Sequence, residues 1–270
     1  MRRAAEAALV AVALAALVAV RAPAASSLPQ TAWGKRVHAA ESYARGRAGL
    51  VSFALIDEAG RRHGYRARAV VPTASLLKAM LLVAYLRMGS VRDRDLTSEE
   101  RGLLAPMIRW SANAPVATIL PRVGARRLYR LARVAHMERF RLAWPVWGLS
   151  ETTARDQVRF FCRIDGLVPA RHRRYALSLL RRIVPSQRWG VAQVPHEGWR
   201  LHFKGGWGSG TGLVDHQSAL LVAGRYRVSL SVTTRFNPDH DYGKATLRGV
   251  ARRLVGRLPV PFANGSYLRH

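Results

Sequence analysis

Residues 75–88, with the sequence SLLKAMLLVAYLRM, restrict the fold of this chain more than any other segment. The segment is apolar almost all round the helix that it predicts, so most of its faces must be buried against other elements. The first half nevertheless contains one basic side chain, Lys78. Because burial disfavours a charge, the surroundings favour the neutral amine. A chain of 270 residues is long enough to enclose such a helix in a substantial core.

Ser75 lies three residues before Lys78, so the two side chains fall on neighbouring positions of one helix face. A serine becomes a useful nucleophile when a base takes its proton, and a lysine can do this only while its amine is neutral. Arginine cannot act as this base, because its guanidinium stays protonated. Only four of the 44 basic residues are lysines, so a lysine in this apolar segment is a notable choice. We therefore predict Ser75 as a catalytic nucleophile and Lys78 as its base, although a single spacing of this kind can also arise by chance.

Two further motifs follow in order along the chain. Ser111-Ala112-Asn113 comes directly after Trp110 in a region of helical composition, and Lys204-Gly205-Gly206 ends a β-rich run and is followed by Trp207. Taken singly, the first could be an ordinary helix N-cap and the second a flexible hairpin. Together with the serine and lysine above, they give the order Ser-x-x-Lys, Ser-x-Asn and Lys-x-Gly.

In this order of motifs, residues 50–258 resemble the class A β-lactamases and the penicillin-binding-protein-like serine hydrolase superfamily. The resemblance implies that Ser75 is acylated, that Lys78 acts as a base and that Ser111 relays a proton to the leaving nitrogen. It also implies that Asn113 holds the substrate amide and that Lys204 supplies positive potential near a substrate carboxylate.

The same resemblance assigns the strand after Lys204 to substrate binding, with Gly205, Gly206 and Trp207 as contact residues. The backbone N–H of Ser75 and that of Gly206 or Trp207 would form an oxyanion hole.

Three departures from the family pattern are visible. Ala112 stands where these enzymes usually have aspartate, and Gly205 replaces a residue with a hydroxyl group. The segment 140–150, FRLAWPVWGLS, contains no carboxylate that could activate a deacylating water. In the family, the activating glutamate belongs to the omega loop, which here corresponds to the segment before Thr152. Glu138 precedes Thr152 by a separation that the family uses, but the residues around Glu138 better match the strand-like entry to that loop. We therefore expect weak binding of ordinary penicillins and slow deacylation.

The β-rich and helical runs alternate in a way that predicts an α+β fold. Strands are expected at 51–57 and 65–71, joined by a hairpin turn at 58–60, and again at 200–206, 217–222 and 226–234. Helices are expected at 31–47 and 242–258. We therefore predict one antiparallel sheet formed by N- and C-terminal strands, with a helical middle subdomain at roughly 75–190.

The first 24 residues have the pattern of a secretory signal peptide. A basic start precedes an apolar run at 7–20, and small residues follow at Ala22-Pro23-Ala24. The alternatives are a membrane anchor, for which the run is short, and a buried helix. We expect residues 25–270 to form one secreted, extracytoplasmic domain. Its single cysteine, Cys162, excludes an intrachain disulfide.

The formal net charge of +28 predicts attraction to polyanions, including an anionic cell envelope, without specific recognition of a nucleic acid. We expect no cofactor and no metal, because His196-Glu197 lacks the second histidine of a zincin site. The preferred hypothesis is a serine hydrolase that forms an acyl-enzyme with β-lactams or with peptidoglycan-derived amides. The alternatives are a D-alanyl peptidase or esterase of the same superfamily, and a non-catalytic protein that binds the envelope.

Overall fold

The computed structural model describes residues 32–210 and 212–260. The predicted signal peptide lies outside the described residues. No helix within these ranges is both long enough and apolar enough to cross a membrane.

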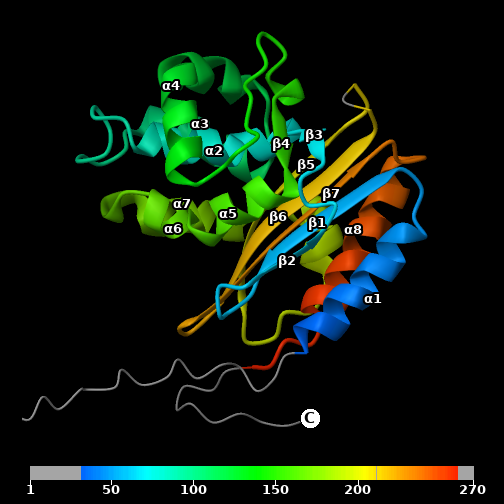
Figure 1. Cartoon of the computed structure of the whole chain (residues 1–270). Helices are drawn as coiled ribbons and strands as arrows, with labels where there is room; N and C mark the ends of the chain where they lie inside the picture. Colours follow the sequence, from blue (N-terminus) through cyan, green and yellow to red (C-terminus); the bar gives the residue numbers. More distant parts are fainter. Residues whose placement is uncertain (1–31, 211, 261–270) are drawn as a thin grey trace, which may run out of the picture.

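The described chain is built on a five-stranded antiparallel sheet in the order β2-β1-β7-β6-β5 (Figure 1). The strands are β1 (Leu50–Ile56), β2 (Arg62–Tyr65), β5 (Arg200–Gly208), β6 (Val214–Ala223) and β7 (Tyr226–Arg235). Strand β1 pairs with β7 from Leu50 opposite Arg235 to Ile56 opposite Ser229. The predicted α+β fold, with an antiparallel sheet that joins the two ends of the chain, is therefore confirmed.

Two helices, α1 (Trp33–Arg45) and α8 (His240–Val255), cover one face of the sheet (Figure 1). They pack closely because Gly249 has no side chain, and a Cβ at that position would collide with the ring of Tyr43. Asp239 occupies the N-cap position of α8, and its side chain accepts a hydrogen bond from the backbone N–H of Tyr242.

The helical region lies on the other side of the sheet (Figure 1). It contains α2 (Leu77–Leu86), α3 (Ser98–Arg109), α4 (Ala114–Val134), α5 (Ala154–Cys162), α6 (Ile164–Leu167) and α7 (Ala170–Arg181). Short 3₁₀ turns are η1 (Ala74–Leu76), η2 (Trp147–Leu149), η3 (Pro185–Gln187) and η4 (Gly190–Gln193). All ten residues of α2 are buried, as its apolar sequence predicts.

Two local predictions are wrong. The expected strand 65–71 is two elements, because the chain turns after Tyr65 and Arg66 has a φ of +47°. Strand β3 (Val70–Pro72) instead pairs with β4 (Glu151–Thr153) in a separate two-stranded sheet. The helix expected to start at Ser75 begins as the 3₁₀ turn η1, and the α-helical part starts at Leu77.

Candidate active site

Ser75 lies in η1, directly before the buried helix α2. The preceding residue, Ala74, has a φ of +43°, in the left-handed region that side chains rarely adopt. Such strain persists only where the surrounding structure imposes it, and it is common at functional sites. Here the N–H of Thr73 donates to the carbonyl of Ser150, which ties the turn to the loop before β4.

Strand β5 runs directly against this turn. A Cβ added to Gly206 would lie 3.0 Å from the backbone nitrogens of Ser75 and Leu76 and from the carbonyl oxygen of Thr73. Glycine is therefore what allows the strand to approach the backbone of the predicted nucleophile. Gly205 and Gly206 are paired with β6 within a regular strand, so this segment is not a flexible hairpin.

The side chain of Lys78 is fully buried and turns toward the second motif. Its Nζ donates to the carbonyl oxygen of Ser111 and, at 2.6 Å, to Oδ1 of Asn113. Burial lowers the pKa of Lys78 to about 8. Asn113 occupies the N-cap position of α4, but its side chain does not cap the helix. The side-chain oxygen binds the lysine instead, which distinguishes this motif from an ordinary N-cap.

Lys204 reaches the same serine from β5. Its Nζ is fully buried and donates to Oγ of Ser111 at 2.9 Å and to the carbonyl oxygen of Gly205 at 2.7 Å. Burial and the charge of Lys78 both lower the pKa of Lys204. Since Nζ of Lys78 is 3.4 Å from the same Oγ, the hydroxyl can accept from both amines. Its own hydrogen is then available to an incoming group.

The structure thus gathers residues of all three predicted motifs around one point, from η1, α2, the loop between α3 and α4, and β5. Among the described residues, no hydrogen bond joins Lys78 to the hydroxyl of Ser75, because the amine is engaged by Ser111 and Asn113. The catalytic roles of these residues stay predictions.

A tryptophan from the loop before β4 lies against Lys78. The ring of Trp147, in η2, has its centroid 5.1 Å from Nζ, within the range of a cation–π contact. Sequence reasoning missed this contact. The segment 140–150 contains two tryptophans, and no signal in the sequence selected Trp147 over Trp144.

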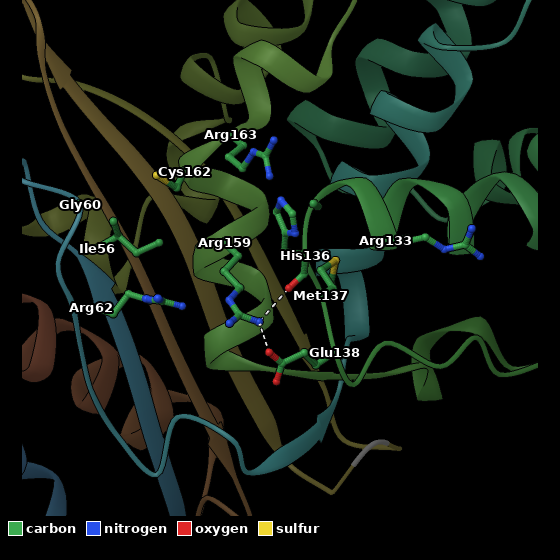
Figure 2. Close-up of a pocket in the computed structure, with 11 residues that line it drawn as sticks. Ile56, Gly60, Arg62, Arg133, His136, Met137, Glu138, Arg159, Cys162 and Arg163 are labelled. Carbon is green, nitrogen blue, oxygen red and sulfur yellow. Dashed lines mark hydrogen bonds and ion pairs between the residues drawn. The ribbon is translucent and has the colours of Figure 1, made fainter.

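The two carboxylates nearest to this loop in sequence are engaged elsewhere. Glu138 forms an ion pair of 2.7 Å with Arg159 on α5, and that hydrogen bond is the main cause of the lowered pKa of Glu138 (Figure 2). Glu151 is held by Arg141, which donates from Nε at 2.9 Å. Neither carboxylate bonds to Lys78, and no cluster of metal-ligating side chains occurs within 32–210 and 212–260.

Trp207, the last of the predicted substrate-binding residues, belongs to an aromatic cluster beside Lys204. Its ring stacks on His240 at 6.2 Å and meets Trp189 edge-on at 5.6 Å. His240 in turn contacts the carboxylate of Asp215, and burial raises the pKa of Asp215 to about 7. Trp189, His240 and Asp215 were not predicted, because they come from three separate segments.

By sequence, no family model and no curated protein matches the chain. By structure, a β-lactamase from Sphaerobacter thermophilus superposes with a TM-score of 0.68 at 18% identity, covering 82% of this chain and 95% of that one. An ancestral class A β-lactamase gives 0.68 at 21% identity, covering 82% and 98%. The structure of PBP-A gives 0.67 at 17% identity, covering 81% and 93%. The resemblance predicted from the three motifs is confirmed at the level of the fold, which this chain shares with the class A β-lactamases and PBP-A.

Proposed function

We propose that the chain is a serine hydrolase that is acylated on Ser75 by β-lactams or by related cell-wall amides. The observation that carries the proposal is a buried Lys78 amine, with a lowered pKa, placed three residues after a serine on a strained turn. Gly206 allows the backbone of β5, with its N–H groups, to pack closely against the same turn. The two named groups of structural neighbours, β-lactamases and PBP-A, support the same chemistry.

Acylation begins when the neutral amine of Lys78 takes the proton of the Ser75 hydroxyl and the oxygen attacks the amide carbonyl. The N–H groups of Ser75 and of Gly206 or Trp207 would bind the oxygen that becomes negative. Ser111 then donates its proton to the leaving nitrogen as the C–N bond breaks. A proton from Lys78 restores the Ser111 hydroxyl, so the ester forms with no net gain or loss of protons.

Hydrolysis of that ester needs a base that positions a water molecule, and the side chain of the 140–150 loop that contacts Lys78 is Trp147, which cannot act as a base. General-base assistance contributes typically about 10²–10⁴-fold, so we propose that deacylation is slower by that factor than in an enzyme that has such a base. This observation favours a penicillin-binding protein, such as a D-alanyl peptidase that passes its acyl group to another acceptor, as the second candidate.

Labelling with a fluorescent penicillin tests the proposal. Wild-type protein should form a covalent adduct that intact-protein mass spectrometry detects, Ser75→Ala should form none, and Ser98→Ala, a change at an exposed helix start, should label normally. Turnover of a chromogenic cephalosporin then distinguishes a lactamase from an acylation trap. Failure of the wild-type protein to label, with any β-lactam or peptidoglycan-derived amide, would favour the non-catalytic envelope-binding alternative.

We also propose that the protein is exported and associates with the anionic envelope through its arginines. N-terminal sequencing of secreted material should give a start near Ala25. Association with envelope fragments should weaken steeply as salt is raised, because screening shortens the range of exposed charges. An intact Met1, or binding that salt does not change, would contradict this proposal.

A further inference from the structure

A cavity of about 620 Å³ opens at the edge of the sheet formed by β1 and β2 (Figure 2). Its walls come from the β1–β2 hairpin, from the C-terminal end of α4 with the residues that follow it, and from α5. The volume lies within the range of about 300–1,000 Å³ that is usual for small-molecule sites.

This cavity is separate from the candidate active site. Ile56, on its wall, lies on β1, whereas Lys204 lies on β5. Strands β7 and β6 stand between them, so three strand spacings, roughly 14 Å, separate the two sites across the sheet.

One guanidinium is fixed in the cavity wall. Arg159 has a side chain only 11% exposed, and its Nη1 donates to Glu138 at 2.7 Å and to the carbonyl oxygen of His136 at 2.8 Å. Both bonds use the same nitrogen. Its Nε and Nη2 have no hydrogen-bond partner among the described residues, so one edge of the planar group stays free to donate.

Two more guanidiniums border the cavity. Arg62 on β2 extends toward Arg159, and Arg163, just after α5, lies on the side of His136 (Figure 2). Both are exposed, and within the described part of the chain neither takes part in an ion pair. Arg133 also contributes to the lining, but its guanidinium points away from the others (Figure 2). The cavity therefore carries more positive charge than its one carboxylate, Glu138, can neutralise.

The rest of the wall is apolar. Ile56 packs against the small cluster of Ala54, Ala154 and Val158, and Met137 packs against the main core. Ala135 and Cys162 complete this surface. A ligand that satisfies both parts of the wall must combine an anionic head with an apolar body.

We propose that this cavity binds a small amphiphilic oxyanion, a phosphate monoester that bears a short alkyl or aryl group. Guanidinium groups donate pairs of hydrogen bonds that match phosphate and carboxylate oxygens. Arg159 and Arg155 are balanced by ion pairs with Glu138 and Asp156. Phosphate is preferred because Arg62 and Arg163 take part in no ion pair among the described residues, which leaves two charges to balance. The site is independent of the acyl-enzyme chemistry proposed above.

Cys162 provides a direct readout, since it lines the cavity and is the only cysteine of the chain. Burial raises the pKa of its thiol, so alkylation by iodoacetamide is measured at alkaline pH. Hexyl phosphate should slow the alkylation in a saturable way. Hexanoate should protect more weakly, and inorganic phosphate and hexanol more weakly still, because each lacks charge or apolar surface.

Variants of the cavity then separate a built site from the general positive charge of the protein. Arg62→Gln and Arg163→Gln should each raise the dissociation constant for hexyl phosphate about tenfold. Glu138→Gln should lower it, because the competing carboxylate is gone. Arg133→Gln is the matched control, since it removes the same charge from a side chain that points away, and it should change the constant less than about twofold.

The experiment can overturn the proposal in two ways. If millimolar hexyl phosphate leaves the alkylation rate of Cys162 unchanged, the cavity does not bind such a ligand. If Arg133→Gln weakens binding as much as Arg62→Gln does, the attraction comes from net charge and not from this cavity. Circular dichroism and thermal melting of each variant show that a loss of protection is not a loss of folding.

Discussion

The pH dependence of Ser75 acylation tests the assignment of Lys78 directly. The amine can accept a proton only in its neutral form, and burial lowers its pKa from 10.5 to about 8. An exposed lysine would be almost entirely protonated at neutral pH. The acylation rate should therefore rise with pH below about 8 and level off above it, rather than rise until pH 10.5.

The size of the effect follows from that pKa. Two units below it, at pH 6, about 1% of the amine is neutral, so acylation should be roughly 100-fold slower than on the plateau. With the ordinary pKa of 10.5 the neutral fraction at pH 8 would be below about 1%, and the rate would still be rising tenfold per pH unit.

The assay is a single-turnover measurement with excess fluorescent penicillin between pH 5.5 and 9.5, checked by intact-protein mass spectrometry. Lys78→Arg should acylate at least about 100-fold more slowly at every pH, because a guanidinium stays protonated. Lys244→Arg is the matched control, since Lys244 forms a surface ion pair with Asp241 and should keep the wild-type profile. A flat profile, or a Lys78→Arg variant with most of its activity, would refute the assignment of the base.

Four further substitutions test the site. Gly206→Ala should reduce acylation roughly 100-fold with little loss of stability, because its Cβ would push against backbone atoms 3.0 Å away; acylation rate and thermal melting measure the two effects. Trp147→Glu should speed deacylation by about 10²–10⁴-fold, measured as the lifetime of the adduct, because it places a carboxylate near Lys78; an unchanged lifetime would show that the loop cannot position water. Glu138→Gln and Glu151→Gln should each change that lifetime by less than about twofold, since arginines hold both carboxylates; a large slowing in either would identify the missing base.

Strand pairing and burial could be predicted from the sequence because they depend on local patterns. The apolar run around Lys78 predicts a buried helix wherever the rest of the chain lies, and α2 is buried throughout. The turn residues at 58–60 predict a hairpin, and β1 and β2 are joined there, although β2 spans 62–65 rather than the expected 65–71. The order of the three motifs resembles that of the class A β-lactamases, and this resemblance implies that α2, the loop before α4 and β5 come together.

The details of the site depend on contacts that no local pattern encodes. Ala74, with its positive φ, lies in a turn that contacts β5 and the loop at Ser150, and both of these segments are distant in sequence. Tryptophan is compatible with a helix, a strand or a loop, so the sequence alone does not place Trp147 against Lys78. Likewise, no local pattern indicates that Glu138 pairs with Arg159 on α5.

The two buried amines of the site constrain each other's charge. Because Lys78 and Lys204 both lie within hydrogen-bond range of Oγ of Ser111, at 3.4 and 2.9 Å, their nitrogens are no more than about 6 Å apart. Two positive charges at that separation repel each other in a buried site, and this repulsion adds to burial in lowering the pKa of Lys204. A charge on either amine therefore favours the neutral form of the other, so we expect the two lysines not to be protonated together in the free protein. One of them then holds a neutral amine without any help from a carboxylate of the loop.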